Sequence, residues 1–506
     1  MVDPTPAKAL ELGNALSSTP PQPGPIRFLS LFPSIFLPML MGMIGETIVA
    51  TALPVIVASL GGVELIAWVV VAYLISLAIT APVYGRLGDA FGRRRMMVVA
   101  LVISLVGSVV CALSTSIEML IAARALQGVG GGGLVSLSFA LIGQSVPPRD
   151  RVRIHGYLVA IGLSASAMGP LVGALLTDSF GWPAVFLVNV PIGLIAIALV
   201  FRLPPRLIPF EPFRFDLPGL LLFASFVWSL LVLVQKIGDP ANLRLAMLAS
   251  LMAIAVISLG LLIAREKRAT DPLFPPALMS NPTIWRCNAM AMCHGAYQVS
   301  VLTFTPVYLR VVRDQSITEI GLMLLPITFG IGIGTFATGQ IVSRTGNAAI
   351  FPTVGMAIAA AMVGFAGLQA DAMPTLLFAA YFGILALTFG TVMGVVQATV
   401  QAESPPTLLG TATAAISLSR ALGAAIGTAV TAATLFAVLA ASGVQISTEL
   451  QAVLQGSGNG LAVLGGAEEH KIRADVAFAF HGVFFVIASY AAICSFLAGS
   501  LPRRTL

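Results

Sequence analysis

Charged residues are scarce in this sequence. Asp, Glu, Lys and Arg make up only 9% of it, whereas 58% of its residues are hydrophobic. Soluble domains usually carry about a quarter charged residues, and a soluble chain of 506 residues needs far more polar surface than this composition supplies. The composition therefore excludes a set of soluble domains and predicts a protein that is solvated mostly by lipid.

Cysteine is also scarce. The four cysteines, Cys111, Cys287, Cys293 and Cys494, lie in apolar segments and lack the spacing of a metal site or a disulfide framework. We therefore expect buried free thiols, with no metal and no cofactor.

The sequence lacks the features of a cleavable signal peptide. Its first 25 residues are rich in proline and contain no apolar core segment, so we expect residues 1–28 to form a disordered cytoplasmic tail. A net charge of +6 can indicate a nucleic-acid partner, but in a membrane protein it more often reflects arginines held on the cytoplasmic side. We expect no nucleic-acid partner.

Long apolar runs make up most of the sequence. They predict membrane-spanning helices, because a bilayer offers no water to unpaired backbone groups and the alternating pattern of a β-barrel is not seen. Fourteen candidate spans lie near residues 30–58, 66–85, 96–114, 118–145, 154–177, 184–203, 216–236, 242–264, 284–309, 317–341, 350–369, 373–401, 409–437 and 474–499.

The distribution of Lys and Arg predicts the orientation. With both termini in the cytoplasm, nineteen of the 27 basic residues fall on the cytoplasmic side and six outside, while Arg124 and Arg420 lie within spans. Such an excess is typical of cytoplasmic loops. We therefore expect a multi-pass protein of the plasma (inner) membrane with both termini inside.

An internal repeat indicates two related halves. The segment GRLGDAFGRRR, between spans 2 and 3, has Gly85 and Gly92 seven residues apart, and Gly339 and Gly346 repeat that spacing between spans 10 and 11. Internal repeats are typical of secondary transporters. The copies are eight spans apart, which predicts two six-helix bundles, 29–203 and 284–506, separated by residues 204–283 with linkers and spans 7 and 8. An outer loop is expected at 438–473.

Four motifs in order resemble those of the major facilitator superfamily, and together they match its fourteen-span drug:proton antiporter branch. They are ETIVATALPVI in span 1, GRLGDAFGRRR after span 2, ARALQGVGGGGLVS in span 4 and AIGLSASAMGPLVGALL in span 5. Two positions depart from that branch: Glu46 stands where Asp is usual, and Trp182 is all that remains of a Trp-Arg-Trp motif. The resemblance implies an all-α major facilitator fold with fourteen transmembrane helices.

The resemblance and the residue chemistry together give two of these motifs a role. The loop motif, with Gly85, Asp89, Gly92 and Arg93, is expected to gate conformational change, because Asp89 can meet an arginine or the positive end of a helix. A simpler alternative is that the arginines only fix topology. The span 5 motif, with Gly162, Gly169, Pro170 and Gly173, is expected to bend the helix and allow close packing, as the antiporter motif of exporters.

Ionisable residues inside spans are the candidates for proton coupling. Glu46 lies near the middle of span 1, and no other acid lies so deep. Ionisable groups at that depth usually line a cavity or pair with another group, so Glu46 is the expected proton carrier and Arg124 its partner or a substrate contact. A structural hydrogen bond is the alternative for Glu46.

Several polar residues within spans are weaker candidates, which could line a substrate cavity between the two halves. Interhelical hydrogen bonding remains an equal alternative for them, and a structural role for His294 is favoured over a proton relay. They are Gln127, Asn288, Tyr297, Gln298, Gln397 and Arg420.

The sequence as a whole predicts proton-coupled efflux of hydrophobic or amphipathic compounds by alternating access. A dedicated exporter of one lipid, siderophore or metabolite remains open. A polytopic membrane enzyme is disfavoured because no catalytic His/Asp or Asp pair lies in a juxtamembrane loop. The expected partners are a small-molecule substrate, protons and lipid; we expect a monomer, with a periplasmic adaptor only if the source is Gram-negative.

Overall fold

The structure is a computed structural model that describes residues 28–49, 51–62, 65–203, 215–237, 245–315, 317–369, 373–441 and 466–501. These residues form helices and no β-strand. Ten of the described helical segments are long and apolar enough to cross a membrane. The predicted tail and most of the predicted outer loop at 438–473 lie outside the described residues.

The first half of the chain is a helical bundle that packs around two apolar cores. Its helices are α2 (Phe28–Thr47), α3 (Leu53–Leu60), α4 (Ile66–Phe91), α5 (Arg93–Ala112), α6 (Ile117–Ser145), α7 (Pro148–Phe180), α8 (Ala184–Leu187) and α9 (Asn189–Val200).

The second half begins after a pair of inserted helices, α10 (Leu217–Ile237) and α11 (Leu245–Glu266). Its core contains packed aromatic rings, where Tyr308 stacks on Phe378 and meets Phe484 edge-on. Its helices are α12 (Pro276–Met279), α13 (Pro282–Val311), α14 (Ile317–Thr345), α15 (Ile350–Gln369), α16 (Thr375–Ala386), the 3₁₀ segment η4 (Leu387–Thr391), α17 (Met393–Glu403), the 3₁₀ segment η5 (Pro406–Leu408), α18 (Leu409–Ala441) and α20 (Gly466–Gly499).

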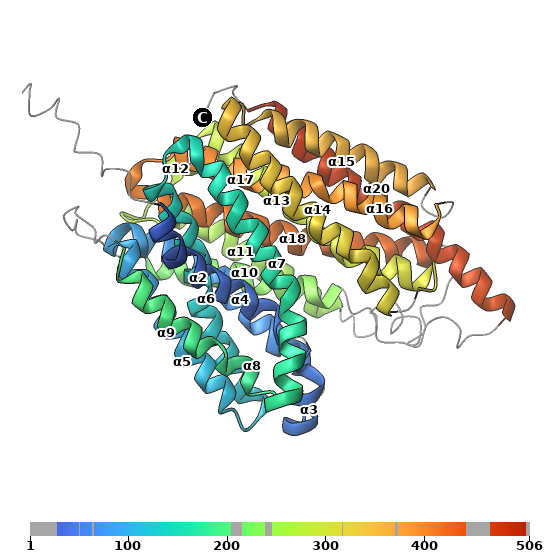
Figure 1. The fold of residues 1–506 in the computed structure, drawn as a ribbon, viewed down its shortest axis with the longest axis horizontal. Coiled ribbons are helices and arrows are strands. Elements are labelled where there is room, and N and C mark those ends of the chain that lie inside the picture. The colour runs from blue at the N-terminus through green and yellow to red at the C-terminus, as the bar shows by residue number, and fades with distance from the viewer. Residues whose placement is uncertain are drawn as a thin grey trace, which may run out of the picture.

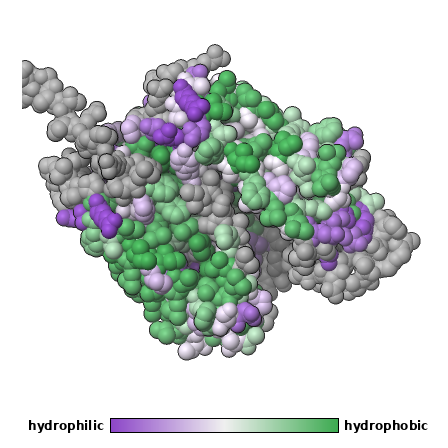
Figure 2. Space-filling view, viewed as in Figure 1, coloured by the Kyte–Doolittle hydropathy of each residue, from purple (hydrophilic) through white to green (hydrophobic). Residues whose placement is uncertain are grey.

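The two halves form two lobes that meet at one end (Figure 1). The inserted helices α10 and α11 pack on each other, and α10 also contacts α4 of the first half and α18 of the second. Figure 2 shows hydrophobic side chains over most of the visible surface of both lobes, with hydrophilic residues gathered near their ends. Apolar side chains point outward along these lobes, as at Leu376, which is 84% exposed. Such a belt suits contact with lipid rather than with water.

Each predicted span coincides with a described helix, but three spans are broken. Span 1 is divided into α2 and α3, where Pro54 at the start of α3 lacks the backbone N–H that a continuous helix would need. Span 6 is divided at Val188, and span 12 passes through η4 between α16 and α17. Hydropathy locates a span, but it carries no signal for these local changes of helix type.

The segment GRLGDAFGRRR was expected to be a loop, and that expectation is wrong for all of it except one residue. Helix α4 continues to Phe91 and α5 begins at Arg93, so Gly92 alone makes the turn, with φ of 95°. A positive φ is accessible to glycine at little cost. The charged residues therefore extend two helices, and we call this end of the bundle, where α4 meets α5 at Gly92, the loop end.

Candidate functional site

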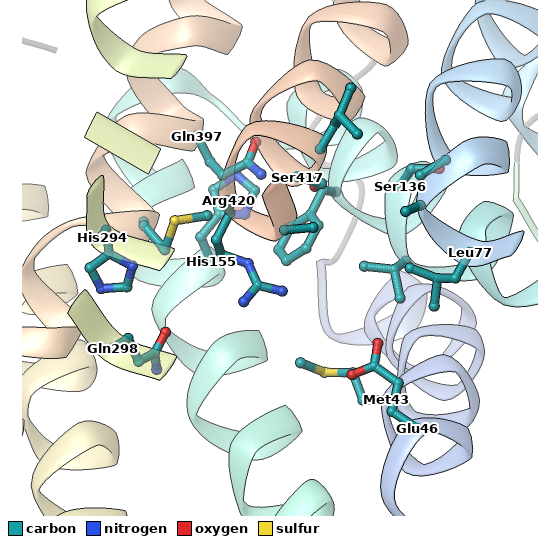
Figure 3. Close-up of a pocket in the computed structure, with 18 of the residues that line it drawn as sticks. Met43, Glu46, Leu77, Ser136, His155, His294, Gln298, Gln397, Ser417 and Arg420 are labelled. Carbon is teal, nitrogen blue, oxygen red and sulfur yellow. The ribbon is translucent and has the colours of Figure 1, made fainter. Parts of the chain in front are cut away.

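A cavity of about 130 Å³ lies between the two halves (Figure 3). The first half lines it from α2, α4, α6 and α7, and the second half from α13, α14, η4, α17 and α18. This volume is enough to hold water, and a site between two related halves is where secondary transporters bind substrate.

Glu46 is half-buried on α2 and lines this cavity. Among the described residues, no side chain or backbone group makes a hydrogen bond or ion pair with its carboxylate. The charges of Arg420 and Arg124 both act on it. Glu46 is therefore an acid that lines the cavity without a hydrogen-bond partner among the described residues.

Arg124 does not line the cavity but lies behind Glu46, fully buried in the first half. Its guanidinium donates to the backbone oxygens of Val69 at 3.0 Å and Gly45 at 3.1 Å, and it lies 4.2 Å from the ring centroid of Tyr73. A third hydrogen bond, 2.6 Å long, reaches Gln127 Oε1. Arg124 thus ties α2, α4 and α6 together beside the candidate proton carrier.

The glycines of the span 5 motif bring α7 against α2 around Glu46. A Cβ atom on Gly162 would overlap Met43 Sδ, one on Gly169 would overlap Thr47 Oγ1, and one on Gly173 would overlap the backbone oxygen of Ile48. Small residues allow such close helix packing in membranes. The backbone of α7 continues through Pro170, whose side chain lies outside the described side chains.

The 3₁₀ segment η4 supplies a backbone acceptor to the cavity. Because η4 interrupts the α-helical hydrogen bonding, the Phe389 carbonyl is available to His294, whose Nε2 lies 3.0 Å away. Close packing of α14 on η4 depends on Gly390, where a Cβ would overlap Thr335 N. His294 is 1% exposed, and it lines the cavity from α13.

Sequence reasoning missed His155 on α7, which lines the cavity together with His294. His155 is fully buried, and its Nε2 lies 3.2 Å from Oε1 of Gln401 on α17. Gln401 Nε2 in turn donates to the Phe139 backbone oxygen at 3.0 Å. The only signal for His155 was its rarity, since the chain has four histidines. Its hydrogen-bond partner Gln401 is 246 positions away in the chain, so the sequence alone does not show the pair.

Three of the six weaker candidates line the cavity, namely Gln298, Gln397 and Arg420. The other three lie outside its walls and correct the expectation that they line it. Their side chains point into the helical bundles and not into the cavity. Gln127 hydrogen-bonds to Arg124 and Ser108, Asn288 accepts a hydrogen bond from Ser419, and the Tyr297 hydroxyl lies 3.1 Å from Thr388 Oγ1.

The loop end of the molecule is held closed across the two halves by Asp89. Its Oδ1 accepts from the Gly410 backbone N–H at 2.9 Å, and its Oδ2 accepts from the Thr411 N–H at 2.8 Å, both at the start of α18. Arg93 donates to Asp89 at 2.7 Å and to Gln144 on α6 at 2.8 Å. A carboxylate at a helix N-terminus is stabilised by the helix dipole and by the free N–H groups there.

The repeated glycines make matching contacts between the halves. A Cβ on Gly85 of α4 would lie 2.6 Å from the Gly410 backbone oxygen on α18, and one on Gly339 of α14 would lie 2.9 Å from Arg153 Cα on α7. Gly346, like Gly92, has a positive φ, 72°. The repeat therefore places one close helix crossing on each side of the loop end, although the second copy has Ser343 in place of Asp89.

No group of three or more His, Cys, Asp or Glu side chains in the described part of the chain could hold a metal ion.

The fold and this cavity define a membrane transport protein of the facilitator class. Residues 35–428 match the Major Facilitator Superfamily, and the chain belongs to that family. Its neighbours in the family and in fold are transporters.

Two bacterial relatives show the kinds of protein that the chain resembles. An uncharacterized MFS-type transporter of Mycobacterium tuberculosis is 34% identical over 407 residues, which cover 80% of this chain and 59% of that protein. The multidrug transporter protein MdtP of Bacillus subtilis is 28% identical over 390 residues, covering 77% of this chain and 72% of that protein. The chain thus spans about three fifths of the length of the mycobacterial relative.

Solved structures share the fold at low sequence identity. The human organic anion transporter MFSD10 superposes with a TM-score of 0.62 at 15% identity, covering 94% of this chain and all of that one. The proton:xylose symporter XylE superposes with a TM-score of 0.56 at 14% identity, covering 94% and 96% of the two chains.

Proposed function

We propose that the protein exports hydrophobic or amphipathic compounds in exchange for protons, by alternating access across the plasma membrane. In this proposal it works as a monomer with fourteen spans, and the loop end and both termini face the cytoplasm. The observation that carries the proposal is Glu46, an acid without a partner among the described residues, in a cavity between the halves.

Alternating access is supported by specific polar contacts that join the halves at the loop end, beside the close packing of α4 on α18 and of α7 on α14. Asp89 and the start of α18 form one such contact, and Gln340 Nε2 donates to the Tyr157 hydroxyl at 2.8 Å on the other side. With the cytoplasmic end closed, a compound would leave the cavity through the outer end. Breaking the contacts at the loop end would open the cavity to the cytoplasm instead, as rocking of one half against the other requires.

Export by exchange needs a group whose charge depends on the side to which the cavity opens. Glu46 meets this need, since a carboxylate that binds a proton from outside and releases it inside carries one proton per cycle. The Arg124 guanidinium donates a hydrogen bond of 3.1 Å to the backbone oxygen of Gly45, the residue before Glu46, and so helps to position Glu46. Relatives named as multidrug transporters favour varied substrates over one native solute.

Transport by purified protein in liposomes tests this proposal. A pH gradient is imposed across the liposome membrane, with the lumen either more acidic or less acidic than the outside. A panel of hydrophobic dyes should be transported only when this gradient is present. Gradient-independent movement, or movement of protons and dye in the same direction, would overturn it. If one compound class alone is moved, the protein is a dedicated exporter rather than a multidrug exporter.

A further inference from the structure

One wall of the cavity, formed mainly by the second half, carries polar groups whose hydrogen-bonding capacity is unmet. The amide of Gln397 on α17 is the strongest case, because the residue is 2% exposed and neither Oε1 nor Nε2 has a partner in the described part of the molecule. Buried polar groups in native proteins are nearly always satisfied, so a buried amide left open calls for a ligand or water. Figure 3 shows Gln397 beside Arg420, His294 and His155.

The hydrogen bond of His294 fixes which of its ring nitrogens is free. Its Nε2 faces the backbone oxygen of Phe389, which can only accept, so Nε2 carries the hydrogen in the neutral ring. Nδ1 is then a lone-pair acceptor, and it is buried without a partner among the described residues.

The same reasoning applies to His155. Gln401 must point its amide nitrogen at the Phe139 backbone oxygen, and its Oε1 therefore faces His155 Nε2. That oxygen accepts, so His155 Nε2 is the donor and Nδ1 is again an acceptor. His155 Nδ1 is also buried with no partner in the described ranges.

Arg420 adds donors to this group. Its guanidinium lines the cavity, and no described residue forms a hydrogen bond or ion pair with it. We call Gln397, His155, His294 and Arg420 the polar wall. It offers the acceptors His155 Nδ1, His294 Nδ1 and Gln397 Oε1, together with the donors of Gln397 and Arg420.

The first half supplies a mostly apolar surface to the same cavity. Met43, Leu77, Ala78, Ala81 and Val135 line it from α2, α4 and α6, and Glu46 and Ser136 are the polar side chains among them. A ligand that fills the cavity thus meets the hydrogen-bonding groups of the polar wall on one side and mostly hydrocarbon on the other, which is the usual anatomy of a small-molecule site.

We propose that the polar wall binds the head group of the exported compound, and that this head group is uncharged and both donates and accepts hydrogen bonds, as a primary amide or a hydroxyl beside a carbonyl does. This proposal rests on the proposed export function. A carboxylate or sulfonate head group has no hydrogen to donate to the acceptors His155 Nδ1, His294 Nδ1 and Gln397 Oε1. While Glu46 is protonated, Arg420 carries the charge that a cation meets in this cavity, and repulsion is strong in a site with little water.

Equilibrium binding to the full chain in lipid nanodiscs, without any gradient, tests the head-group chemistry. Three fluorescent probes share a naphthyl body: naphthamide, its N,N-dimethyl derivative, which can only accept, and naphthylmethyl-trimethylammonium, a cation. We expect naphthamide to bind about tenfold more tightly than the dimethyl amide, with the cation weakest. Tightest binding by the cation, or equal binding by all three probes, would overturn the proposal.

Gln397→Leu separates ligand binding from folding. The substitution removes no hydrogen bond among the described residues, so the melting temperature should stay the same or rise, whereas naphthamide affinity should fall about tenfold. Affinity for the dimethyl amide should fall less. Leu77→Ala, on the apolar surface, is the matched control and should weaken all three probes alike. A Gln397→Leu protein that melts earlier and binds naphthamide as the parent does would assign Gln397 to structure and contradict the proposal.

Arg420→Gln provides the reciprocal test. Removing the charge should raise affinity for the cationic probe relative to naphthamide, and an unchanged ratio would contradict the role given to Arg420. Because these measurements use no proton gradient, the head-group proposal can fail while gradient-driven export stands, and the reverse also holds.

Discussion

Asp89 on α4 and Thr411 on α18 are joined by two hydrogen bonds, 2.8 Å from the Thr411 backbone N–H and 3.0 Å from its Oγ1. The two residues are 322 positions apart in the chain and belong to different halves. A side chain from one half therefore satisfies the start of a helix in the other, where free N–H groups need an acceptor. The bond can form only while the loop end is closed.

We predict that Asp89→Asn weakens this closure. Asparagine keeps the shape but loses the charge and one acceptor, and hydrogen bonds to charged groups contribute about 1.5–3 kcal/mol. A loss of about 2 kcal/mol shifts the balance between closed and open loop ends roughly thirty-fold. Spin-label distances between α4 and α18 should lengthen, and transport at matched expression should fall.

Asp150→Asn is the control for that experiment. Asp150 pairs with Arg153 on its own helix, 3.2 Å away and partly exposed, so it contributes little to stability and nothing across the halves. If both variants leave distances and transport as in the parent, the charged segment serves topology alone.

We predict that Gly173→Ala lowers both thermal stability and transport. Its new Cβ would overlap the Ile48 backbone oxygen and push α2, with Glu46, away from α7. Gly364→Ala on α15 is a matched control, because no atom lies within 4 Å of the added Cβ. That substitution should leave transport intact and raise helix stability by up to about 1 kcal/mol. Equal effects of the two changes on the melting temperature would show that the α2–α7 packing is loose.

Arg124 and Arg420 should respond differently to the same substitution. Arg124→Lys loses the planar fork that holds three acceptors and should lower the melting temperature markedly. Arg420→Lys removes no hydrogen bond found among the described residues and should leave the melting temperature near that of the parent. Thermal unfolding of both purified variants checks this, and a reversed order would contradict the structural role given to Arg124.

Topology can be tested with reporters fused after selected residues. Fusions after residues 268 and 504 should report the cytoplasm, and one after residue 456 should report the outside. A reporter after residue 268 on the opposite side from one after residue 504 would break the proposed arrangement of two six-span halves around two inserted spans.

The sequence could locate the helices because long apolar runs are visible without packing, and it drew attention to Glu46 because an acid is rare in such a run. It could not tell Gln127 from Gln397, because both are glutamines in apolar runs and only their rotation about the helix decides which one faces the cavity. It missed the pairing of His155 with Gln401, which depends on how two halves dock. The local breaks at Val188 and η4 also have no hydropathy signal, since apolar residues continue through them.

The central claim is that Glu46 carries the exchanged proton, and proton release on substrate binding tests it most directly. Purified protein in weakly buffered solution receives a transported compound while a pH-sensitive dye records protons. Glu46→Gln keeps the size of the side chain but cannot ionise, and Glu46→Asp keeps the acid. We predict that the parent releases protons as substrate binds, that Glu46→Asp retains part of the signal, and that Glu46→Gln binds substrate without releasing any. A Glu46→Gln protein with the full proton signal and gradient-driven transport of the parent would contradict the account.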